Sequence, residues 1–201
     1  VKDFELLSDD ELIPDAVCGY SFKVPLVETY RYLRWLHDKL VGLGVVFIKR
    51  SVTSLQDEIV STKADLLVNC LGLGNRVLLN DKEITAVRGV LVRAKTPSNV
   101  IPRFWDFPDH PKGLSYGIIR RDVALFGGTD NQDDFSLEPR EDAERIEKQA
   151  KQIDPSFADW KVESVWVGQR PFRTSVRLEK DDSFKDCFVI HNYGHGGAGH
   201  T

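Results

Sequence analysis

A glycine-rich run at residues 194–199 (Gly-His-Gly-Gly-Ala-Gly) directly follows an apolar stretch, residues 188–193, that is typical of a strand. When a strand leads into such a loop, the backbone can approach a phosphate or a flat polar ring with its N–H groups facing the ligand. The alternative is a tight turn between two strands. Four glycines in six residues exceed what a turn needs, so the run predicts a ligand site.

Three histidines, His191, His195 and His200, lie in or beside this run at spacings of four and five residues. Zinc sites hold His or Cys ligands on rigid elements with a third ligand nearby. Here the imidazoles lie among flexible glycines, which favours structural histidines that form hydrogen bonds in a turn. We therefore expect no metal.

A second glycine pair, Gly72 and Gly74, follows another predicted strand. It resembles the start of a GxGxxG dinucleotide loop, but Val77 stands where that loop requires its third glycine. The glycine pair alone is equally compatible with an ordinary loop that follows a strand and binds no ligand.

Three arginines, Arg170, Arg173 and Arg177, lie in one predicted strand and turn. A guanidinium is a planar, bidentate donor suited to a carboxylate. Arg170 and Arg177 are seven residues apart, so in a regular strand they face opposite sides. A surface salt bridge is the default for each, and Arg170, between Gly168 and Pro171, is the one best placed for a pocket.

Hydrophobic periodicity predicts the elements that carry these residues. Apolar residues at helical spacing indicate a helix over 24–43. A stretch rich in Glu and Lys, with Pro139 near its start and Asp154-Pro155 after its end, indicates a surface helix over 139–153. Strands are expected at residues 45–48, 64–70, 87–94, 117–126, 162–167, 172–178 and 187–193. The strands do not alternate evenly with helices, which favours a mixed α/β (α+β) fold over a simple doubly wound sheet.

Composition narrows the class of protein. The 201 residues contain 27 Lys and Arg against 31 Asp and Glu, a net charge of −4 with no basic block, which argues against a nucleic acid or an anionic membrane as partner. No apolar run approaches the roughly 18–20 residues of a membrane helix. The three cysteines lack metal or CxxC spacing, and we expect reduced thiols in a non-secretory compartment. Because the chain has no methionine, we expect it to be an internal fragment of a longer protein.

Residues 189–199 resemble the signature of the D-amino-acid oxidase and D-aspartate oxidase family. Further segments resemble that family in the same order and at about its spacing: residues 30–36, 68–72, 87–89, 113–116, 125–129 and 170–179. The resemblance covers essentially the whole chain. The first strand with its GxGxxG loop and the C-terminal helix of the family have no counterpart here.

The resemblance implies an FAD enzyme that oxidises a D-amino acid to its imino acid, which yields a 2-oxo acid and ammonia, while O₂ becomes hydrogen peroxide. It implies that Arg170 and Tyr116 bind the substrate carboxylate and that the Gly197 carbonyl receives the amino group. The Cα–H then points at flavin N5, and the protein orients the substrate without an acid–base residue. Implied FAD contacts are Val52, Cys70, Leu71, Gly72, Gly196, Gly197, Ala198, Gly199, His200 and Thr201.

The resemblance also implies a D-amino-acid-oxidase-like architecture, in which remnants of an FAD-binding domain interleave with a mixed-sheet substrate domain. We expect residues 1–201 to be a single fragment in which about 75–185 belong mostly to the substrate domain and the flanking parts to the FAD-binding domain. The family implies a peroxisomal protein, otherwise a cytoplasmic one, and is compatible with a homodimer. Nucleic acid and membrane are not expected as partners.

Several positions depart from the family pattern. Leu71 replaces the usual hydroxyl residue and Val90 the usual glutamine. Asp109 and Asp130 stand where D-aspartate oxidases carry arginines that bind the substrate side chain. Two acidic residues would repel an acidic substrate, which favours neutral or basic D-amino acids, unless both lie on solvated loops.

Two alternatives stay open. The first is a D-aspartate oxidase that uses other arginines, such as Arg103, Arg120 or Arg121. The second is a non-catalytic fragment or degenerate homologue that keeps the fold without turnover.

Overall fold

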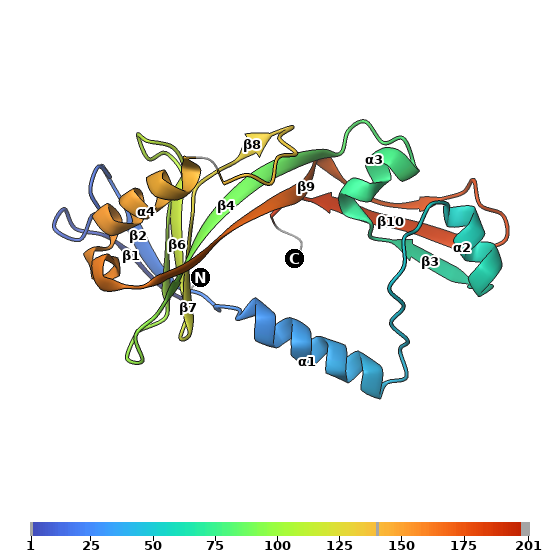
Figure 1. Ribbon diagram of the computed structural model, residues 1–201, viewed down its shortest axis with the longest axis horizontal. Coiled ribbons are helices and arrows are strands. Elements are labelled where there is room, and N and C mark those ends of the chain that lie inside the picture. The colour runs from blue at the N-terminus through green and yellow to red at the C-terminus, as the bar shows by residue number, and fades with distance from the viewer. Residues whose placement is uncertain (1, 140, 198–201) are drawn as a thin grey trace. The chain divides into compact units, whose positions relative to one another are not determined.

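The computed structural model describes residues 2–139 and 141–197, and it shows helices together with a mixed sheet (Figure 1). The chain divides into two compact units, each built from three separate stretches of sequence. Unit 1 comprises Val1–Phe47, Gly89–Asp130 and Leu137–Val167, and unit 2 comprises Ile48–Arg88, Asn131–Ser136 and Gly168–Thr201. The predicted mixed α/β class is confirmed.

Unit 1 contains antiparallel strands with a helix against one face. Strand β5 (Arg103–Phe107) pairs with β6 (Ser115–Ile119), β6 with β7 (Val123–Gly127), and β7 with the second half of β4 (Thr85–Lys95). Val92 of β4 and Phe126 of β7 are directly opposite cross-strand partners, so their side chains point to the same face of the sheet. There they are buried with Ile146 of α4 (Asp142–Ile153) and Phe157 of the short helix η2 (Pro155–Asp159).

Helix α4 lies within the range predicted for a surface helix, and it buries one face. Its buried residues Ile146, Gln149, Ala150 and Ile153 recur at spacings of three and four, which is one face of an α-helix. Unit 1 also contains the hairpin of β1 (Lys2–Leu6) and β2 (Tyr20–Lys23), and helix α1 (Thr29–Gly42). Helix α1 has no buried residue in this structure.

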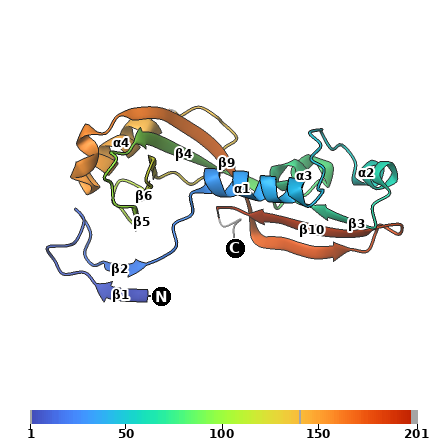
Figure 2. The same cartoon turned by 90° about the horizontal axis from the view of Figure 1, so that it is seen from below.

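Unit 2 contains the parallel strand pair that carries both glycine loops. Strand β3 (Leu66–Asn69) runs parallel to β10 (Phe188–His195), which pairs antiparallel with the later part of β9 (Val162–Asp181) (Figure 2). The remaining elements are α2 (Leu55–Thr62), η1 (Gly72–Gly74), α3 (Asn75–Leu78) and the short β8 (Asn131–Gln132). Both β4 and β9 continue from one unit into the other.

Helix α2 begins at a conventional cap. The Ser54 hydroxyl accepts a hydrogen bond from the Asp57 amide, which satisfies one of the free N–H groups of the first turn. The helix buries Leu55 and Ile59 against Cys187 and Val189, which forms the apolar core of unit 2.

Several predicted elements differ from the structure. Residues 45–48 form no strand, and their side chains are exposed. The strand expected over 117–126 is a hairpin of β6 and β7, because residues 120–122 turn the chain. The two strands expected on either side of Pro171 are one strand, β9. Elements β1, β2, β5, β8, α2 and α3 were not predicted.

Candidate functional site

The two glycine loops of unit 2 leave neighbouring parallel strands at their carboxyl ends. Asn69, the last residue of β3, is in register with His191 of β10. The carboxyl edge of parallel strands is where open α/β sheets bind ligands. The predicted cofactor contacts Cys70, Leu71 and Gly72 follow β3, and Gly196 and Gly197 follow β10.

Pro171 of β9 contacts both loops. The Gly196 amide donates to the Pro171 carbonyl oxygen at 2.8 Å. A Cβ added at Gly72 would lie 3.3 Å from Cβ of Pro171, and Gly72 has a φ of +52°, a conformation that disfavours a side chain. Unit 2 therefore brings the Gly72 and Gly196 loops to the same proline.

Arg170 lies along Gly197. A Cβ added at Gly197 would lie 3.6 Å from Cδ and 3.9 Å from Nε of Arg170. Arg170 is half-buried and Gly197 is exposed. The two residues predicted to bind the substrate carboxylate and amine are thus neighbours, although 27 positions separate them along the chain.

Tyr116 lies on the face of the unit 1 sheet opposite the α4 core. Its strand neighbours Ser115 and Gly117 are buried toward the core, whereas the Tyr116 ring lies over Gly127 of β7, where an added Cβ would overlap it. Tyr116 also lines a hollow of about 210 Å³ with Phe104, Asp106 and Ile118. Tyr116 therefore belongs to unit 1, and Arg170 and Gly197 belong to unit 2.

Asp106 is the acidic residue that the structure places beside Tyr116. The two residues are cross-strand partners, and side chains at such positions lie close together. Partial burial raises the pKa of the Asp106 carboxyl. Sequence reasoning missed Asp106 because β5 was not predicted.

The two aspartates that the sequence singled out lie elsewhere in unit 1. Asp109 is exposed in the turn after β5, and Asp130 is exposed after β7. The remaining predicted cofactor contact, Val52, is half-buried and packs against the Leu55 and Ile59 cluster. The predicted contacts Ala198, Gly199, His200 and Thr201 lie outside the described residues.

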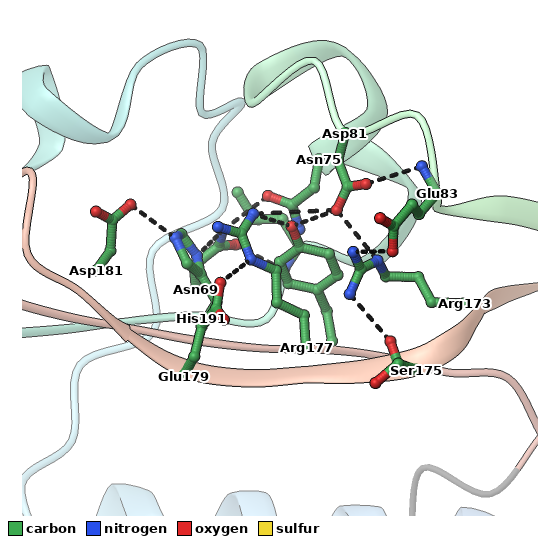
Figure 3. A network of polar contacts seen from close by, with 12 residues as sticks. Asn69, Asn75, Asp81, Glu83, Arg173, Ser175, Arg177, Glu179, Asp181 and His191 are labelled. Carbon is green, nitrogen blue, oxygen red and sulfur yellow. Dashed lines mark hydrogen bonds and ion pairs between the residues drawn. The ribbon is translucent and has the colours of Figure 1, made fainter.

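A buried polar network supports the loop after β3 (Figure 3). His191 is fully buried, and its Nδ1 lies 3.0 Å from Asn69 Nδ2 and its Nε2 lies 3.0 Å from Asp181 Oδ2. Asn69 Oδ1 accepts from the Leu71 amide at 3.1 Å. The contacts of His191 with Asn69 and Asp181 were not predicted, because the three residues lie on different strands that are distant in the sequence.

The other two arginines of β9 form internal ion pairs (Figure 3). Arg173 donates to Glu83 at 2.6 Å, and its Nε lies 3.3 Å from Asp81. Arg177 donates to the Tyr193 hydroxyl at 2.8 Å, and that hydroxyl donates to Asp81. Both are therefore engaged within unit 2. Arg173 also lies against Gly194, where an added Cβ would be 2.9 Å from its Cδ, and Arg170 is the arginine beside Gly197.

The pKa of Asp81 shows that this cluster favours the ionised carboxylate. Burial works against ionisation, but the hydrogen bonds from Tyr193 and from the Glu83 amide, together with the charges of Arg173 and Arg177, lower the pKa of Asp81. The Asp81 charge is thereby fixed beside the strand that leads to Gly196.

Among residues 2–139 and 141–197, no group of three or more His, Cys, Asp or Glu side chains could hold a metal ion. In the same residues, no helix has the length and apolar character needed to cross a membrane. His195 instead contacts Asn192 at 2.8 Å.

Comparison with known proteins identifies relatives along the whole chain. It is 34% identical to a D-amino-acid oxidase of Rubrobacter xylanophilus, in an alignment that covers 100% of this chain and 61% of that protein. It is 35% identical to a D-amino-acid oxidase of Dictyostelium discoideum, over 100% of this chain and 58% of that protein. Human D-aspartate oxidase is 30% identical over 99% of this chain and 58% of that protein. The chain thus spans about three fifths of the length of these relatives.

Solved structures share the fold. Glycine oxidase from Geobacillus kaustophilus superimposes with a TM-score of 0.55 at 19% identity, covering 67% of this chain and 37% of that one. Glycine oxidase from Bacillus cereus superimposes with a TM-score of 0.53 at 18% identity, covering 67% and 38%. The model of the FAD-dependent oxidoreductase (DAO) family matches residues 2–201. The chain therefore belongs to the FAD-dependent oxidoreductase family, and its cofactor is FAD.

Proposed function

We propose that this chain forms the substrate-orienting part of an FAD-dependent D-amino-acid oxidase. The observation that carries the proposal is the position of Arg170, whose Nε lies 3.9 Å from where a Cβ of Gly197 would be, so that its guanidinium is beside an exposed backbone turn. A guanidinium binds a carboxylate in bidentate fashion, and a carbonyl oxygen accepts from an ammonium or amine. An α-amino acid carries both groups on one carbon, so adjacent sites for them suit its head group.

In the proposed mechanism, Arg170 binds the substrate carboxylate and the Gly197 carbonyl accepts a hydrogen bond from the amine, both within unit 2. These two attachments restrict the orientation of the Cα–H, which lowers the entropy cost of reaching the transition state. The role of the Tyr116 hydroxyl at the carboxylate is proposed from the family resemblance alone. No side chain needs to hold or move a proton, so the protein contributes orientation. When bound, FAD would supply the two-electron acceptor that turns the amino acid into an imino acid and passes the electrons to O₂, which gives hydrogen peroxide.

The described loops fit a flat, phosphate-bearing cofactor. Three of the five described loop contacts, Gly72, Gly196 and Gly197, have no side chain, so a ring or phosphate can approach the backbone. Cys70 and Leu71 are exposed at the carboxyl edge of β3. We assign these positions to FAD, with unit 2 as the cofactor-binding part and unit 1 as most of the substrate domain.

The charge around Tyr116 supports a neutral or basic substrate. Asp106 lines the hollow beside Tyr116, and within the described residues it has no ion pair that would neutralise it. A carboxylate there repels an acidic side chain and attracts a cationic one. Asp106, Asp109 and Asp130 are all exposed, and of the three it is Asp106 that lines the hollow beside Tyr116.

The D-aspartate oxidase alternative needs a free arginine near Tyr116. Arg103 instead donates to Asp154 at 2.5 Å, on the face of β5 opposite Phe104 and Asp106. Arg120 donates to Thr29 at 3.3 Å. These contacts weigh against Arg103 and Arg120 in that role. Arg121 is exposed in the turn between β6 and β7, and human D-aspartate oxidase is among the relatives, so the alternative stays open for Arg121.

The experiment is a hydrogen peroxide assay on the natural full-length protein with FAD, using D-alanine, D-arginine and D-aspartate in parallel. Arg170→Ala should lose at least about 100-fold in kcat/KM, because a charged hydrogen-bond pair is lost in the transition state. Arg34→Ala, an exposed arginine of α1, is the matched control and should retain activity. Preference for D-aspartate would favour the alternative, and no turnover with flavin bound would favour a non-catalytic homologue.

A further inference from the structure

The backbone after β3 is held by two buried asparagines. Asn69 Oδ1 accepts from the Leu71 amide at 3.1 Å, and Asn75 Nδ2 donates to the Gly72 carbonyl at 3.2 Å. Asn69 Nδ2 donates to Asn75 Oδ1 at 2.7 Å, which links the two side chains. Both asparagines are at most 2% exposed, so water does not substitute for these bonds.

The hydrogen bond from the Leu71 amide to Asn69 Oδ1 fixes which groups donate and which accept in the rest of the network. Because Asn69 uses its oxygen to accept from the backbone, its amide nitrogen faces His191 Nδ1 at 3.0 Å. An NH₂ group only donates, so Nδ1 must be the acceptor and the ring proton must sit on Nε2. The Nε2–H then donates to Asp181 Oδ2 at 3.0 Å.

Asp181 is a fixed end of this chain of hydrogen bonds. The Ser183 hydroxyl and amide donate to Asp181 Oδ1 at 2.6 and 2.9 Å, which leaves Oδ2 for His191. The Ser183 bonds, followed by the contact with His191, lower the pKa of Asp181 to about 2, so the acceptor is ionised at neutral pH.

We propose that Asp181 and His191 are positioning residues that act through Asn69 to fix the Leu71–Gly72 backbone for the flavin. The flavin part of this inference rests on the proposed function. The geometry assigns one polarity to the relay: Asp181 accepts, neutral His191 donates from Nε2 and accepts at Nδ1, and Asn69 holds the loop amide. The loop after β3 needs such support, because Gly72 and Gly74 have no side chain to pack and those of Cys70 and Leu71 are exposed.

The test has readouts that do not depend on turnover. In the full-length protein, nitrogen NMR of histidine-labelled samples at pH 7 should find the His191 proton on Nε2. Asn69→Asp keeps the acceptor for the Leu71 amide but removes the donor to Nδ1, and it should add a proton at Nδ1. An Nδ1–H tautomer in the unaltered protein would overturn the assigned polarity.

His191→Phe removes both hydrogen bonds and keeps a ring of similar size. We expect faster amide exchange at Leu71 and a roughly tenfold weaker FAD affinity, because the two lost hydrogen bonds affect FAD only through the Leu71–Gly72 backbone. Tyr193→Phe is the matched control, since it removes the hydroxyl that contacts Arg177 and Asp81 two residues further along β10 and leaves the relay intact. It should leave Leu71 exchange unchanged.

The outcomes separate the relay from the proposed function. If the unaltered protein binds no FAD, the proposed function fails, while the His191 tautomer and Leu71 exchange still decide whether the relay exists. If FAD binds and His191→Phe lowers its affinity no more than Tyr193→Phe does, the positioning role is overturned. If His191→Gln, which can accept from Asn69 and donate to Asp181, restores affinity relative to His191→Phe, the relay is supported.

Discussion

The two units stabilise their functional residues in different ways. In unit 1, Tyr116 lies on an antiparallel sheet whose other face is an apolar core of residues such as Phe126 and Phe157. In unit 2, the loop after β3 is held by directional hydrogen bonds among Asn69, His191 and Asp181. Apolar packing tolerates changes of shape that conserve volume, whereas a buried hydrogen-bond network tolerates no reversal of donor and acceptor.

All four tryptophans lie in unit 1, so tryptophan fluorescence reports on that unit alone. Unit 2 can be followed by amide exchange along β3 and β10. The comparison between the units can therefore be tested with one protein and two probes.

Phe157→Ala should have the largest effect. Phe157 is fully buried against Phe126, with ring centroids 4.1 Å apart, and its loss leaves a cavity that costs about 3–5 kcal/mol of unfolding free energy. Denaturant titration followed by tryptophan fluorescence measures it. A matched exposed position, Phe188→Ala in unit 2, should leave the fluorescence transition in place. A small effect of Phe157→Ala would show that this core is not what supports unit 1.

Asn69→Leu should destabilise unit 2 by about 2–3 kcal/mol. The variant keeps the volume but leaves the Leu71 amide and His191 Nδ1 without their partner, and unsatisfied buried groups carry that cost. Amide exchange along β3 measures the loss, while the tryptophan transition should move less. Equal shifts of both probes would mean that the two units unfold together.

Acid should weaken unit 2 through Asp181. Its pKa is about 2 in the folded protein against a usual value of 3.8. A lowered pKa contributes stability that is present above about pH 4 and is lost as the pH falls toward 2, by roughly 2 kcal/mol. Asp181→Asn should flatten this part of the pH profile of β10 exchange, and the exposed Asp182→Asn should not. If Asp181→Asn left the pH profile unchanged, the Asp181 carboxylate would not be what makes the stability of unit 2 depend on pH in this range.

Gly127→Ala should act on the site of unit 1 more than on its stability. The added methyl group overlaps the Tyr116 ring, and the cost of overpacking is about 1–2 kcal/mol if the ring moves away. We expect kcat/KM to fall in the peroxide assay of the full-length protein. Gly42→Ala meets no atom within 4 Å and is the control. Unchanged kcat/KM would argue against a substrate role for Tyr116.

Arg31→Ala should have the smallest effect. Its contacts with Glu28 and Asp122 are exposed ion pairs at 3.2 and 3.8 Å, and such pairs contribute at most a few tenths of a kcal/mol. The tryptophan transition should shift within error. A shift above about 1 kcal/mol would mean that α1 is held more tightly than these exposed contacts account for.

The sequence predicted the elements with the strongest periodicity. Helix α4 was expected because of its Glu and Lys content and the prolines at its two ends, and strands β4 and β10 because they are apolar runs. Strand β5 was missed because charged residues at Arg103 and Asp106 interrupt its pattern. The strands expected over 162–167 and 172–178 are one strand, β9, which continues through Gly168 and Pro171. Residues 45–48 are apolar but form no strand, so the strand predicted there from composition alone is wrong.

The site was predictable only in part. The glycine loops and Arg170 follow from residue types and from the family resemblance, and their roles stay predictions. The partners of His191 did not follow, because Asn69 lies 122 residues away and a buried asparagine has no sequence pattern of its own. Asp106 was likewise not predicted, because only the pairing of β5 with β6 shows that it lies beside Tyr116.

The adjacency of Arg170 and Gly197 has an evolutionary consequence. Both residues belong to the hairpin of β9 and β10 and the loop that follows it, so one structural module carries the proposed recognition of the amino-acid head group. Substitutions outside this hairpin and its loop can therefore accumulate in a lineage while the pair of Arg170 and Gly197 is inherited as one piece.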